Sequence, residues 1–373
     1  MKILYISKST IPSRTANSIH VMKMCQAFSD NGHDVVLLAP QIKNKYEKAV
    51  EDIYDYYGVK KNFQIKKFWH PDLKLGAILY TIIIFFYLVF NKKFDLVFGR
   101  FLHGCFVAAL LKNKVVFESH EAILTKKSHQ SFILKKLIKY KNFKKLIVIS
   151  KALKEMYLKS GYLSSSKIQV AHDGADEVVD FEEKTELLGS RNSLKIGYVG
   201  HLYKGRGIEK IVECASKLDD VTFHIVGGLK EDILYWKNYC KNLKLNNIYF
   251  YGFVPPKETI KFRNSFDLVL APYANEVSVK GLGDTSKFMS PIKIFEYMSH
   301  KKAIIASDLP VIREVLDETN SILLDYDDTN LWINSIKKLR VSNIREIIAT
   351  KALADFYKYT WKNRAELIIQ KIV

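Results

Sequence analysis

Short apolar runs alternate with helical patterns along the whole chain, and this alternation constrains the fold more than any other feature. In the first half the runs are KILYIS (2–7), DVVLLA (34–39), FDLVFG (94–99), KVVFES (114–119), KLIVIS (145–150) and KIQVAH (167–172). In the second half they are LKIGYVG (194–200), VTFHIVGG (221–228), IYFYGFV (248–254), FDLVLAPY (266–273), KAIIASD (302–308) and SILLD (321–325). Such continuous runs are typical of parallel strands buried on both faces. We therefore expect an α/β protein with doubly wound parallel sheets.

The length and one acidic segment predict two domains. A chain of 373 residues exceeds one ordinary hydrophobic core. We expect one Rossmann-like domain at 1–176, a linker at 177–193 and a second Rossmann-like domain at 194–355. The last segment, 356–373, is expected to be a helix that packs back toward the first domain. In such sheets ligands bind beyond the carboxyl ends of the strands, so functional residues are sought there.

The charge balance indicates an anionic partner. The chain has 58 Lys and Arg against 39 Asp and Glu, a net charge of +19. Nucleic acid, an anionic membrane surface or a phosphorylated small molecule would each satisfy this charge. The lysines are scattered instead of clustered with aromatic residues, which disfavours nucleic acid. The four cysteines form no CxxC pair, so neither zinc nor disulfides are indicated, and without a signal segment a cytoplasmic location is expected.

One apolar segment leaves three alternatives open. LGAILYTIIIFFYLVF, 75–90, is 16 residues without a charge. As a helix it spans about 24 Å, against ~30 Å for a bilayer core. It is a short transmembrane helix, a buried core helix, or a helix that also touches a membrane surface. Lys92 and Lys93 after it, with the basic stretch 133–145, support the surface alternative.

Two helix starts in the second half are candidate anion sites. HLYKGRG follows a strand and precedes a helix, and Gly200, Gly205 and Gly207 let the backbone approach a ligand beside Arg206. The glycine spacing fits neither a dinucleotide fingerprint nor a P-loop. The alternative is a tight turn with a solvated arginine.

The second helix start is SPIKIFEYM, 290–298. Ser290 is expected at the N-cap and Pro291 at the first helical position. Lys293 then faces the positive end of the helix dipole, which is unfavourable unless a bound phosphate makes it a counter-ion. Glu296, one turn deeper, could accept both hydroxyls of a ribose. The alternative is a surface ion pair between Lys293 and Glu296.

Taken together, these motifs resemble a known family. VGHLYKGRGIEKIVE, FHIVGG, YFYGFVPPKE, FDLVLAPY, SPIKIFEYMSHKKAIIASDLPVIREVL, VISKALKE with VAHDGAD, and YTWKNRAELI are similar to the retaining family 4 glycosyltransferases of the SPxKxFEYM subgroup. The resemblance implies a GT-B fold, two Rossmann-like domains facing a central cleft. It also implies that the first domain binds the acceptor and the second binds the nucleotide sugar.

The resemblance implies roles by position. Arg206 and Lys293 correspond to the residues that grip the donor diphosphate, and Glu296 to the ribose-binding glutamate of E-x7-E; the first glutamate is replaced by Phe288. The implied donor-site residues are Gly200, His201, Gly205, Arg206, Gly227, Phe253, Ser290, Pro291, Lys293 and Glu296. The implied catalytic residues are His120, Arg206, Lys293 and Glu296. The candidates for donor-sugar or acceptor contact are Asn17, Ser18 and His20, in a loop after the first strand, with His120, Gly283, Asp284 and Ser286.

The implied reaction transfers a hexose-type sugar from a UDP- or GDP-sugar, with retention, to a glycan or lipid-linked acceptor in bacterial surface polysaccharide or glycoconjugate synthesis. No metal and no further cofactor are expected, and no nucleic acid. The enzyme is expected in the cytoplasm, at the inner face of the plasma membrane. A GT-B nucleotide-sugar epimerase is the alternative enzyme; it predicts free UDP without an acceptor and a cluster of carboxylate or histidine bases. A basic nucleic-acid or membrane-surface binding protein is the alternative of another class.

Overall fold

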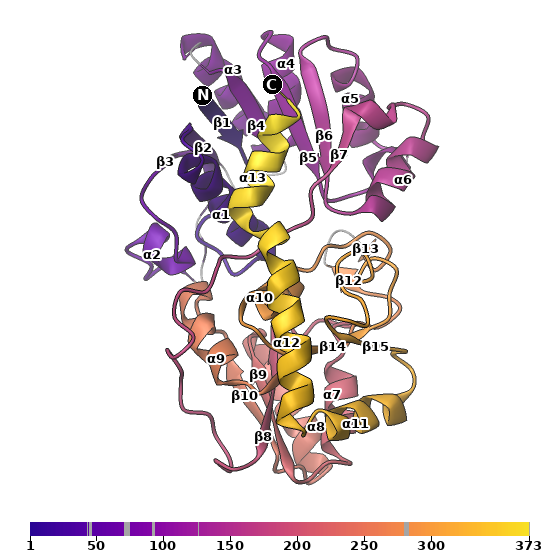
Figure 1. The fold of residues 1–373 in the computed structure, drawn as a ribbon. Helices are drawn as coiled ribbons and strands as arrows, with labels where there is room; N and C mark the ends of the chain where they lie inside the picture. Colours follow the sequence, from indigo (N-terminus) through magenta and orange to yellow (C-terminus); the bar gives the residue numbers. More distant parts are fainter. Residues whose placement is uncertain are drawn as a thin grey trace. The chain divides into compact units, whose positions relative to one another are not determined.

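The computed structural model describes residues 1–42, 44, 47–70, 75–91, 94–125, 127–279 and 283–372. Lys92 and Lys93, predicted to flank a membrane-surface helix, lie outside these residues. The chain forms two compact units, Met1–Asp173 with Trp361–Val373, and Gly174–Thr360. Each unit has its own parallel sheet with helices around it, which confirms the α/β fold class (Figure 1).

The first unit contains a seven-stranded parallel sheet in the order β3-β2-β1-β4-β5-β6-β7. The strands are β1 (Lys2–Ile6), β2 (Asp34–Gln41), β3 (Gln64–Trp69), β4 (Leu96–Gly99), β5 (Val115–Ser119), β6 (Phe143–Val148) and β7 (Ile168–Val170). All six runs predicted in this half are strands. The additional strand, β3, has the sequence QIKKFW and lies at the edge of the sheet. It was not predicted because its two lysines interrupt the apolar run that identifies the other strands.

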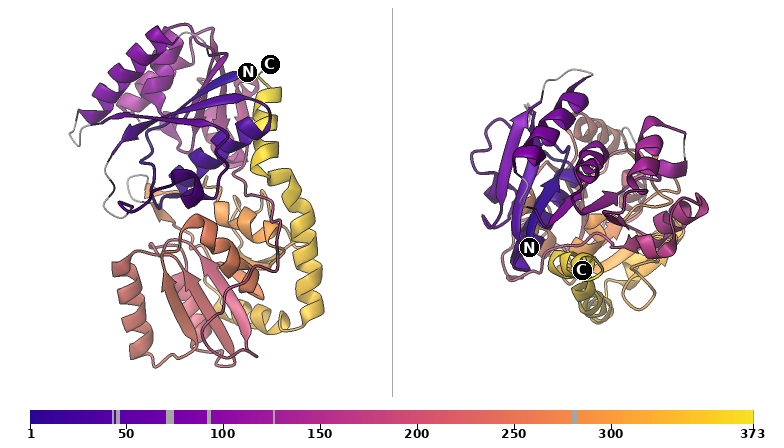
Figure 2. Two further views of the ribbon diagram at one scale, coloured as in Figure 1. Left: turned by 90° about the vertical axis from the view of Figure 1, so that its left-hand side faces the viewer. Right: turned by 90° about the horizontal axis from the view of Figure 1, so that it is seen from above.

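The helices of this unit cover both faces of the sheet. They are α1 (Ala16–Asp30), α2 (Ile53–Tyr57), α3 (Gly76–Phe90), α4 (Leu102–Leu110), α5 (His129–Leu137), α6 (Lys151–Lys159) and α13 (Trp361–Gln370), with the short 3-10 turns η1 (Ile123–Thr125) and η2 (Ser165–Lys167). The strand order reverses between β1 and β4, and right-handed crossovers therefore put α1 on one face and α3, α4 and α5 on the other (Figure 2). The C-terminal helix α13 packs beside α1.

The segment after β1 is a helix and not the predicted loop. Thr15 has extended backbone angles, and its side chain accepts a hydrogen bond from the Ser18 backbone N–H, which is an N-cap. Asn17, Ser18 and His20 therefore lie in the first turns of α1. Because the helix starts before these residues, the helical backbone restricts the directions of their side chains.

The apolar segment forms helix α3, which has one buried face and one exposed face. Gly76, Tyr80, Ile84 and Leu88 are buried against the unit. The large side chains of the opposite face are exposed: Leu75, Ile78, Ile82, Phe86 and Phe90. The interpretation as a core helix thus holds for one face only. Within the described part of the chain, no helix has the length and apolar character needed to cross a membrane.

The second unit repeats the design with six parallel strands in the order β10-β9-β8-β11-β14-β15. The strands are β8 (Leu194–Val199), β9 (Val221–Val226), β10 (Ile248–Gly252), β11 (Leu268–Ala271), β14 (Ala303–Ser307) and β15 (Ile322–Leu324), and all six were predicted. The helices are α7 (Ile208–Ala215), α8 (Lys230–Asn242), α9 (Thr259–Ser265), α10 (Ile292–Ser299), α11 (Thr329–Lys338) and α12 (Ser342–Phe356), with the 3-10 turns η3 (Pro256–Glu258) and η4 (Tyr357–Tyr359). An antiparallel pair, β12 (Ser278–Val279) and β13 (Gly283–Asp284), was not predicted.

Candidate functional site

In the second unit, two glycines allow the turn after β8 to pack closely against Lys293 and Pro272. Gly200 has a φ of 149°, and a Cβ built there would lie 3.0 Å from the Lys293 Nζ. Gly207, at the N-cap position of α7, has a φ of 81°, and a Cβ there would lie 1.6 Å from the Pro272 carbonyl oxygen. A side chain at either position would be strained or would clash. The sheet reverses its strand order between β8 and β11, which is where such sheets bind ligands.

Helix α10 begins one residue later than predicted. Its N-cap position is occupied by Pro291, which has a φ of −75° and a ψ of 115°, so Ile292 is the first helical residue. The prediction that Ser290 is the N-cap is therefore wrong, because residues before proline avoid the helical region and the chain turns only after the ring. The start of α10 has no side-chain cap hydrogen bond. Its first amides remain suited to an anion.

Lys293 is buried in an aromatic box at this helix start. The residue is 9% exposed, and its Nζ lies 3.6 Å from the ring centre of Tyr198 and 5.2 Å from that of Tyr273. Among the described residues the Nζ has no hydrogen-bond partner. Burial, and then the charge of Arg206, hold the pKa of Lys293 well below its ordinary value. The alternative of a surface ion pair with Glu296 is therefore wrong.

Arg206 adds a second cation to the same box. Its guanidinium carbon lies 5.5 Å from the ring centre of Tyr273, and its Nε is buried with no hydrogen-bond partner in the described part of the chain. The Tyr198 hydroxyl, between these groups, donates a hydrogen bond to the His201 carbonyl oxygen at 2.7 Å. A buried lysine and a half-buried arginine beside the same aromatic ring suit an anion with more than one charge.

Glu296 lies one turn further along α10. Its Oε1 is 3.3 Å from the Nη1 of Arg263, a buried side chain of α9, and its own side chain remains 25% exposed. Arg263 in turn donates from its Nε to the Nε2 of His300 at 3.3 Å. The contact with Arg263 fixes the direction of the Glu296 carboxylate. Glu296 is the residue predicted from the sequence to bind a ribose.

The loop before α10 satisfies its own polar groups. Asp284 accepts hydrogen bonds from the backbone N–H groups of Val277 and Ser286, at 3.0 and 2.9 Å, and from the Ser286 hydroxyl at 3.0 Å. Burial alone would raise the pKa of Asp284, but these hydrogen bonds lower it. Gly283 and Asp284 are exposed and Ser286 is buried. Their contact with a donor sugar stays a prediction.

The remaining predicted donor-site residues also lie at carboxyl ends of the strands. The ring of His201 stacks on that of Tyr203, with centres 4.8 Å apart. Gly205 lies in the turn between β8 and α7, where a Cβ would lie 2.1 Å from the Glu276 carbonyl oxygen. Gly227 and Phe253 follow β9 and β10. Sequence and structure thus bring the predicted set to one edge of one sheet.

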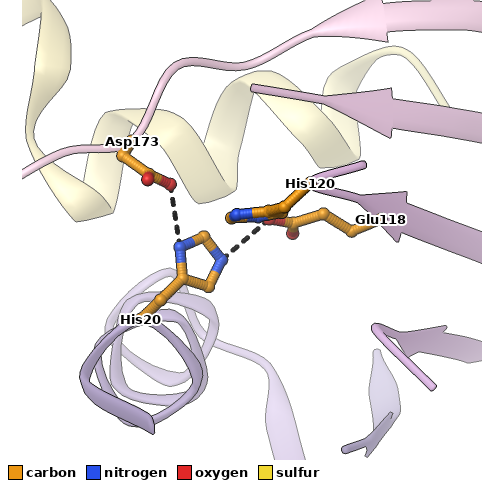
Figure 3. Close-up of side chains that lie close together, drawn as sticks. All are labelled: His20, Glu118, His120 and Asp173. Carbon is orange, nitrogen blue, oxygen red and sulfur yellow. Dashed lines mark hydrogen bonds and ion pairs between the residues drawn. The ribbon is translucent and has the colours of Figure 1, made fainter. Parts of the chain in front are cut away.

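In the first unit, four titratable side chains meet at the carboxyl end of β5 (Figure 3). His20 extends from α1, its Nδ1 lying 2.9 Å from the Asp173 Oδ1 and its Nε2 lying 2.8 Å from the Glu118 Oε1. The Nε2 of His120 lies 2.6 Å from the same Glu118 oxygen. His20, Glu118 and Asp173 are almost completely buried, while the His120 side chain is 17% exposed.

Arg364 completes this cluster from α13. Its Nη2 donates to the Glu118 Oε1 at 3.0 Å and to the Ala171 carbonyl oxygen at 3.1 Å, and its Nε donates to the His172 carbonyl oxygen at 2.7 Å. Burial acts to raise the pKa of Glu118, but the charges of Arg364 and His20, with hydrogen bonds from both histidines, hold it well below its ordinary value. Glu118 is therefore a permanent carboxylate.

The ionised Glu118 fixes the proton of His120. A carboxylate only accepts, so the His120 Nε2 carries the hydrogen in this contact. Burial, and then the charge of Arg100, lower the pKa of His120 to about 4. The ring is therefore neutral at physiological pH, and its Nδ1 accepts no hydrogen bond from the described residues. His120 is thus ready to accept a hydrogen bond from a hydroxyl group.

The neutral state of His120, with its proton on Nε2, can be measured. Nitrogen NMR of the ring should show a neutral His120 protonated at Nε2 from pH 7.5 down to pH 5, since the pKa of about 4 lies below that range. Because the folded pKa lies below the ordinary value of 6.5, the unfolded chain binds more protons in this window. The contribution of His120 to stability is therefore complete above pH 6.5 and is lost as the pH falls to about 4. Protonation near pH 6.5 would contradict the assignment.

The model of "Glycosyltransferase Family 4" matches residues 18–178, and that of "Glycosyl transferases group 1" matches residues 193–340, together more than half of the chain. The chain belongs to the family 4 glycosyltransferases. This glycosyltransferase is also 27% identical to an uncharacterized glycosyltransferase of Methanocaldococcus jannaschii, over 97% of its own chain and 95% of the relative.

Solved structures confirm the fold. The Anabaena protein HepE in complex with UDP superposes with a TM-score of 0.74 at 16% identity, covering 99% of each chain. A glycosyltransferase of Rickettsia africae gives 0.73 at 15% identity, covering 99% of this chain and 97% of its own. A mutant of the S. aureus protein TarM, in complex with fondaparinux, α-GlcNAc-glycerol and UDP, gives 0.70 at 11% identity, covering 100% of this chain and 99% of its own. The glycosyltransferase therefore has the GT-B fold.

The four-residue cluster is also the place where a metal would be sought in this glycosyltransferase. One ligand atom from each of His20, Glu118, His120 and Asp173 lies within 4.8 Å of the others. Histidine and carboxylate ligands suit zinc. Arg364, however, already donates to the Glu118 oxygen that the two histidines share. The contacts fit an ion-paired network, and metal independence stays a prediction.

Several residues of the two sites were missed by sequence reasoning. Glu118, Asp173 and Arg364 stand inside the motifs ESHE, VAHDGAD and YTWKNRAELI, yet only His120 was assigned a role in them. Tyr198 and Tyr273, which form the box around Lys293, lie near the end of β8 and just after β11. The signal for these tyrosines was their position at the carboxyl ends of two neighbouring strands, although each reads equally well as an ordinary core residue.

Proposed function

We propose that this glycosyltransferase moves a hexose-type sugar from a nucleoside diphosphate sugar, a UDP- or GDP-sugar, to a glycan or lipid-linked acceptor, with retention and without a metal ion. The observation that carries the proposal is the buried Lys293, whose Nζ has no hydrogen-bond partner in the described part of the chain. A buried cation without a partner is costly, and a diphosphate supplies the missing charge. The UDP complex of HepE supports a uridine donor by analogy.

The diphosphate is the leaving group of this reaction. As the bond to the sugar breaks, negative charge develops on the diphosphate, and Lys293, Arg206 and the amides at the start of α10 would stabilise it. Retaining attack occurs on the face of the leaving group, so a phosphate oxygen can take the acceptor proton. Glu296 would hold the ribose, and neutral His120 would position a sugar or acceptor hydroxyl.

The cluster in the first unit also favours a second candidate, a nucleotide-sugar epimerase. That activity needs bases, and His20, Glu118, His120 and Asp173 form a group of histidines and carboxylates. Glu118 and Asp173 are poor bases, because ion pairs and hydrogen bonds hold both of their pKa values low against the effect of burial. Transfer is therefore the better proposal.

A donor screen tests the proposal. The melting temperature of the purified protein is measured with UDP-, GDP-, ADP- and CMP-sugars. In a separate assay the released nucleotide is measured with and without glycan and lipid-linked acceptors. Stabilisation by a UDP- or GDP-sugar, with release that depends on an acceptor, would support transfer. Stabilisation by none of them would contradict it. Free UDP and an epimerised sugar formed without acceptor would establish the epimerase instead. A lipid-linked acceptor would place the enzyme at the inner face of the plasma membrane.

The lowered pKa of Lys293 predicts proton uptake on donor binding. Burial and Arg206 disfavour the charged form in the free protein, and a bound diphosphate restores it. UDP or GDP should therefore bind with uptake of up to about one proton at alkaline pH, and more weakly as the pH rises. Calorimetry at pH 8.5 in buffers of different ionisation enthalpy measures this number. In Lys293→Met the uptake should disappear; equal uptake in the variant would assign the proton elsewhere.

A further inference from the structure

Helix α3 carries an apolar face that nothing in the described part of its own unit covers. Its 15 residues contain no charged side chain. Four large residues spaced one turn apart are exposed: Ile78 by 57%, Ile82 by 45%, Phe86 by 52% and Phe90 by 79%. The rings of Phe86 and Phe90 stack with centres 6.5 Å apart. An exposed apolar stripe of this length is unusual on a soluble surface and indicates an interaction site.

The face cannot be turned inward, because the opposite side of α3 is part of the core. The Tyr80 hydroxyl donates a hydrogen bond to the Ser7 carbonyl oxygen at 3.0 Å, and a Cβ at Gly104 of α4 would lie 3.2 Å from Ile84. A helix of 15 residues is also only about 22 Å long, against ~30 Å for a bilayer core. α3 is therefore held on the outside of the sheet (Figure 2), and the side chains on its outer face are exposed.

Basic residues gather at one end of this face. Crossover helices run antiparallel to the strands, so the carboxyl ends of α3 and α4 lie near the amino ends of the strands. Lys2 and Lys66 line a hollow of about 470 Å³ together with Tyr87 and the exposed Phe90. The Lys66 Nζ lies 5.4 Å from the Tyr87 ring centre. Two exposed acidic residues lie beside Lys2: the Asp34 carboxylate is 4.0 Å from the Lys2 Nζ, and Asp95 accepts a hydrogen bond from the Lys2 backbone N–H at 2.7 Å. Exposed pairs of this kind neutralise only part of the positive charge.

The end of α4 extends the same basic and apolar edge. Leu110 is 51% exposed, and Lys112 and Lys114, which follow it, are not buried. α4 packs beside α3, and both helices end near the amino ends of the strands, so these residues lie at the same end of the unit as Phe90. Lysines with long apolar stems and charged ends are the residues that suit the boundary between acyl chains and lipid headgroups.

We infer that the outer face of α3 docks this protein on an anionic lipid surface, with the helix in the plane of the surface and the lysines at the headgroups. The inference adds a partner to the proposed function and does not depend on the donor. Charge complementarity decides between a lipid surface and a second copy of this chain. Two copies joined through this face would bring like charges together on a chain of net charge +19, whereas anionic headgroups neutralise them.

Co-sedimentation of the full-length protein with vesicles tests the inference. Binding to phosphatidylcholine vesicles that contain phosphatidylglycerol should exceed binding to pure phosphatidylcholine and should weaken in high salt. The double variant Ile82→Gln with Phe86→Gln should bind about tenfold less or weaker still, because two exposed apolar side chains no longer enter the lipid. Both positions are exposed, so the melting temperature and UDP or GDP binding should stay unchanged; this separates a failure of docking from a failure of the proposed function.

A matched control comes from the second unit. Leu234 and Tyr235 of α8 are each 60% exposed, and Leu234→Gln with Tyr235→Gln should leave vesicle binding as it is in the unchanged protein. Equal binding by the α3 variant and the unchanged protein would overturn the inference. So would light scattering that shows a dimer in the unchanged protein and a monomer in the α3 variant, since the face would then be buried between two copies.

Discussion

Lys293→Met is expected to stabilise the protein while it abolishes sugar transfer. The lysine is buried, and its Nζ has no hydrogen-bond partner among the described residues, so its charge opposes folding. Methionine has a similar length without the charge, and replacing a poorly compensated buried ion in this way commonly adds about 1–4 kcal/mol to the free energy of unfolding. Loss of the cation at the leaving group should lower kcat by about 100-fold or more. Urea unfolding and initial rates measure the two effects.

Lys210→Met is the matched control for this prediction. Lys210 is also buried, but its Nζ donates to the Glu213 Oε2 at 2.6 Å and to the Thr329 hydroxyl at 2.5 Å. Its removal takes the ammonium from both acceptors and leaves Glu213 only the hydrogen bond from the Thr329 hydroxyl at 2.6 Å, so this variant should be less stable than the unchanged protein. Opposite signs for the two lysines are the expected result. A destabilised Lys293→Met, or one with full activity, would contradict the role of Lys293 as a site cation.

Arg364→Met is expected to destabilise the protein strongly. Arg364 faces Glu118 at 3.0 Å in a site where both side chains are almost completely buried, and it also donates to two backbone carbonyl oxygens. Removing one partner of a buried ion pair leaves the other charge uncompensated, which costs about 3–5 kcal/mol. Urea unfolding of the variant measures this loss.

Two further variants show whether the loss comes from the buried charge. Arg340→Met removes an exposed arginine that faces the exposed Asp220 and should change stability by no more than about 1 kcal/mol. Adding Glu118→Gln to Arg364→Met should restore part of the stability, because it removes the charge left behind. An Arg364→Met loss as small as that of Arg340→Met would mean that the network does not hold α13 in place.

The strands were predictable because both sheets are parallel and buried. A strand covered on two faces must be apolar throughout, and such runs stand out against the turns around them. The edge strand β3 failed this test, since Lys66 and Lys67 interrupt its apolar residues. The helix start at Thr15 was missed, although Thr15 is a favourable N-cap residue.

The site in the second unit was largely predictable and the network in the first was not. Arg206, Lys293 and Glu296 belong to two short motifs whose spacing indicates helix starts, so their chemistry could be inferred locally. His20 and Asp173 are 153 residues apart, and Glu118 and Arg364 are 246 apart. No spacing rule connects such residues, because the sheet topology and the return of α13 bring them together.

Calorimetric titration with UDP and GDP, and with uridine and guanosine, measures how much the diphosphate contributes to binding. One nucleoside diphosphate should bind the unchanged protein, its nucleoside should bind at least about tenfold more weakly, and Lys293→Met should lose this difference. The tenfold limit corresponds to about 1.4 kcal/mol, a modest value for a desolvated charge pair. Equal binding of nucleoside and diphosphate, or an unchanged preference in Lys293→Met, would contradict the claim that Lys293 holds the donor diphosphate.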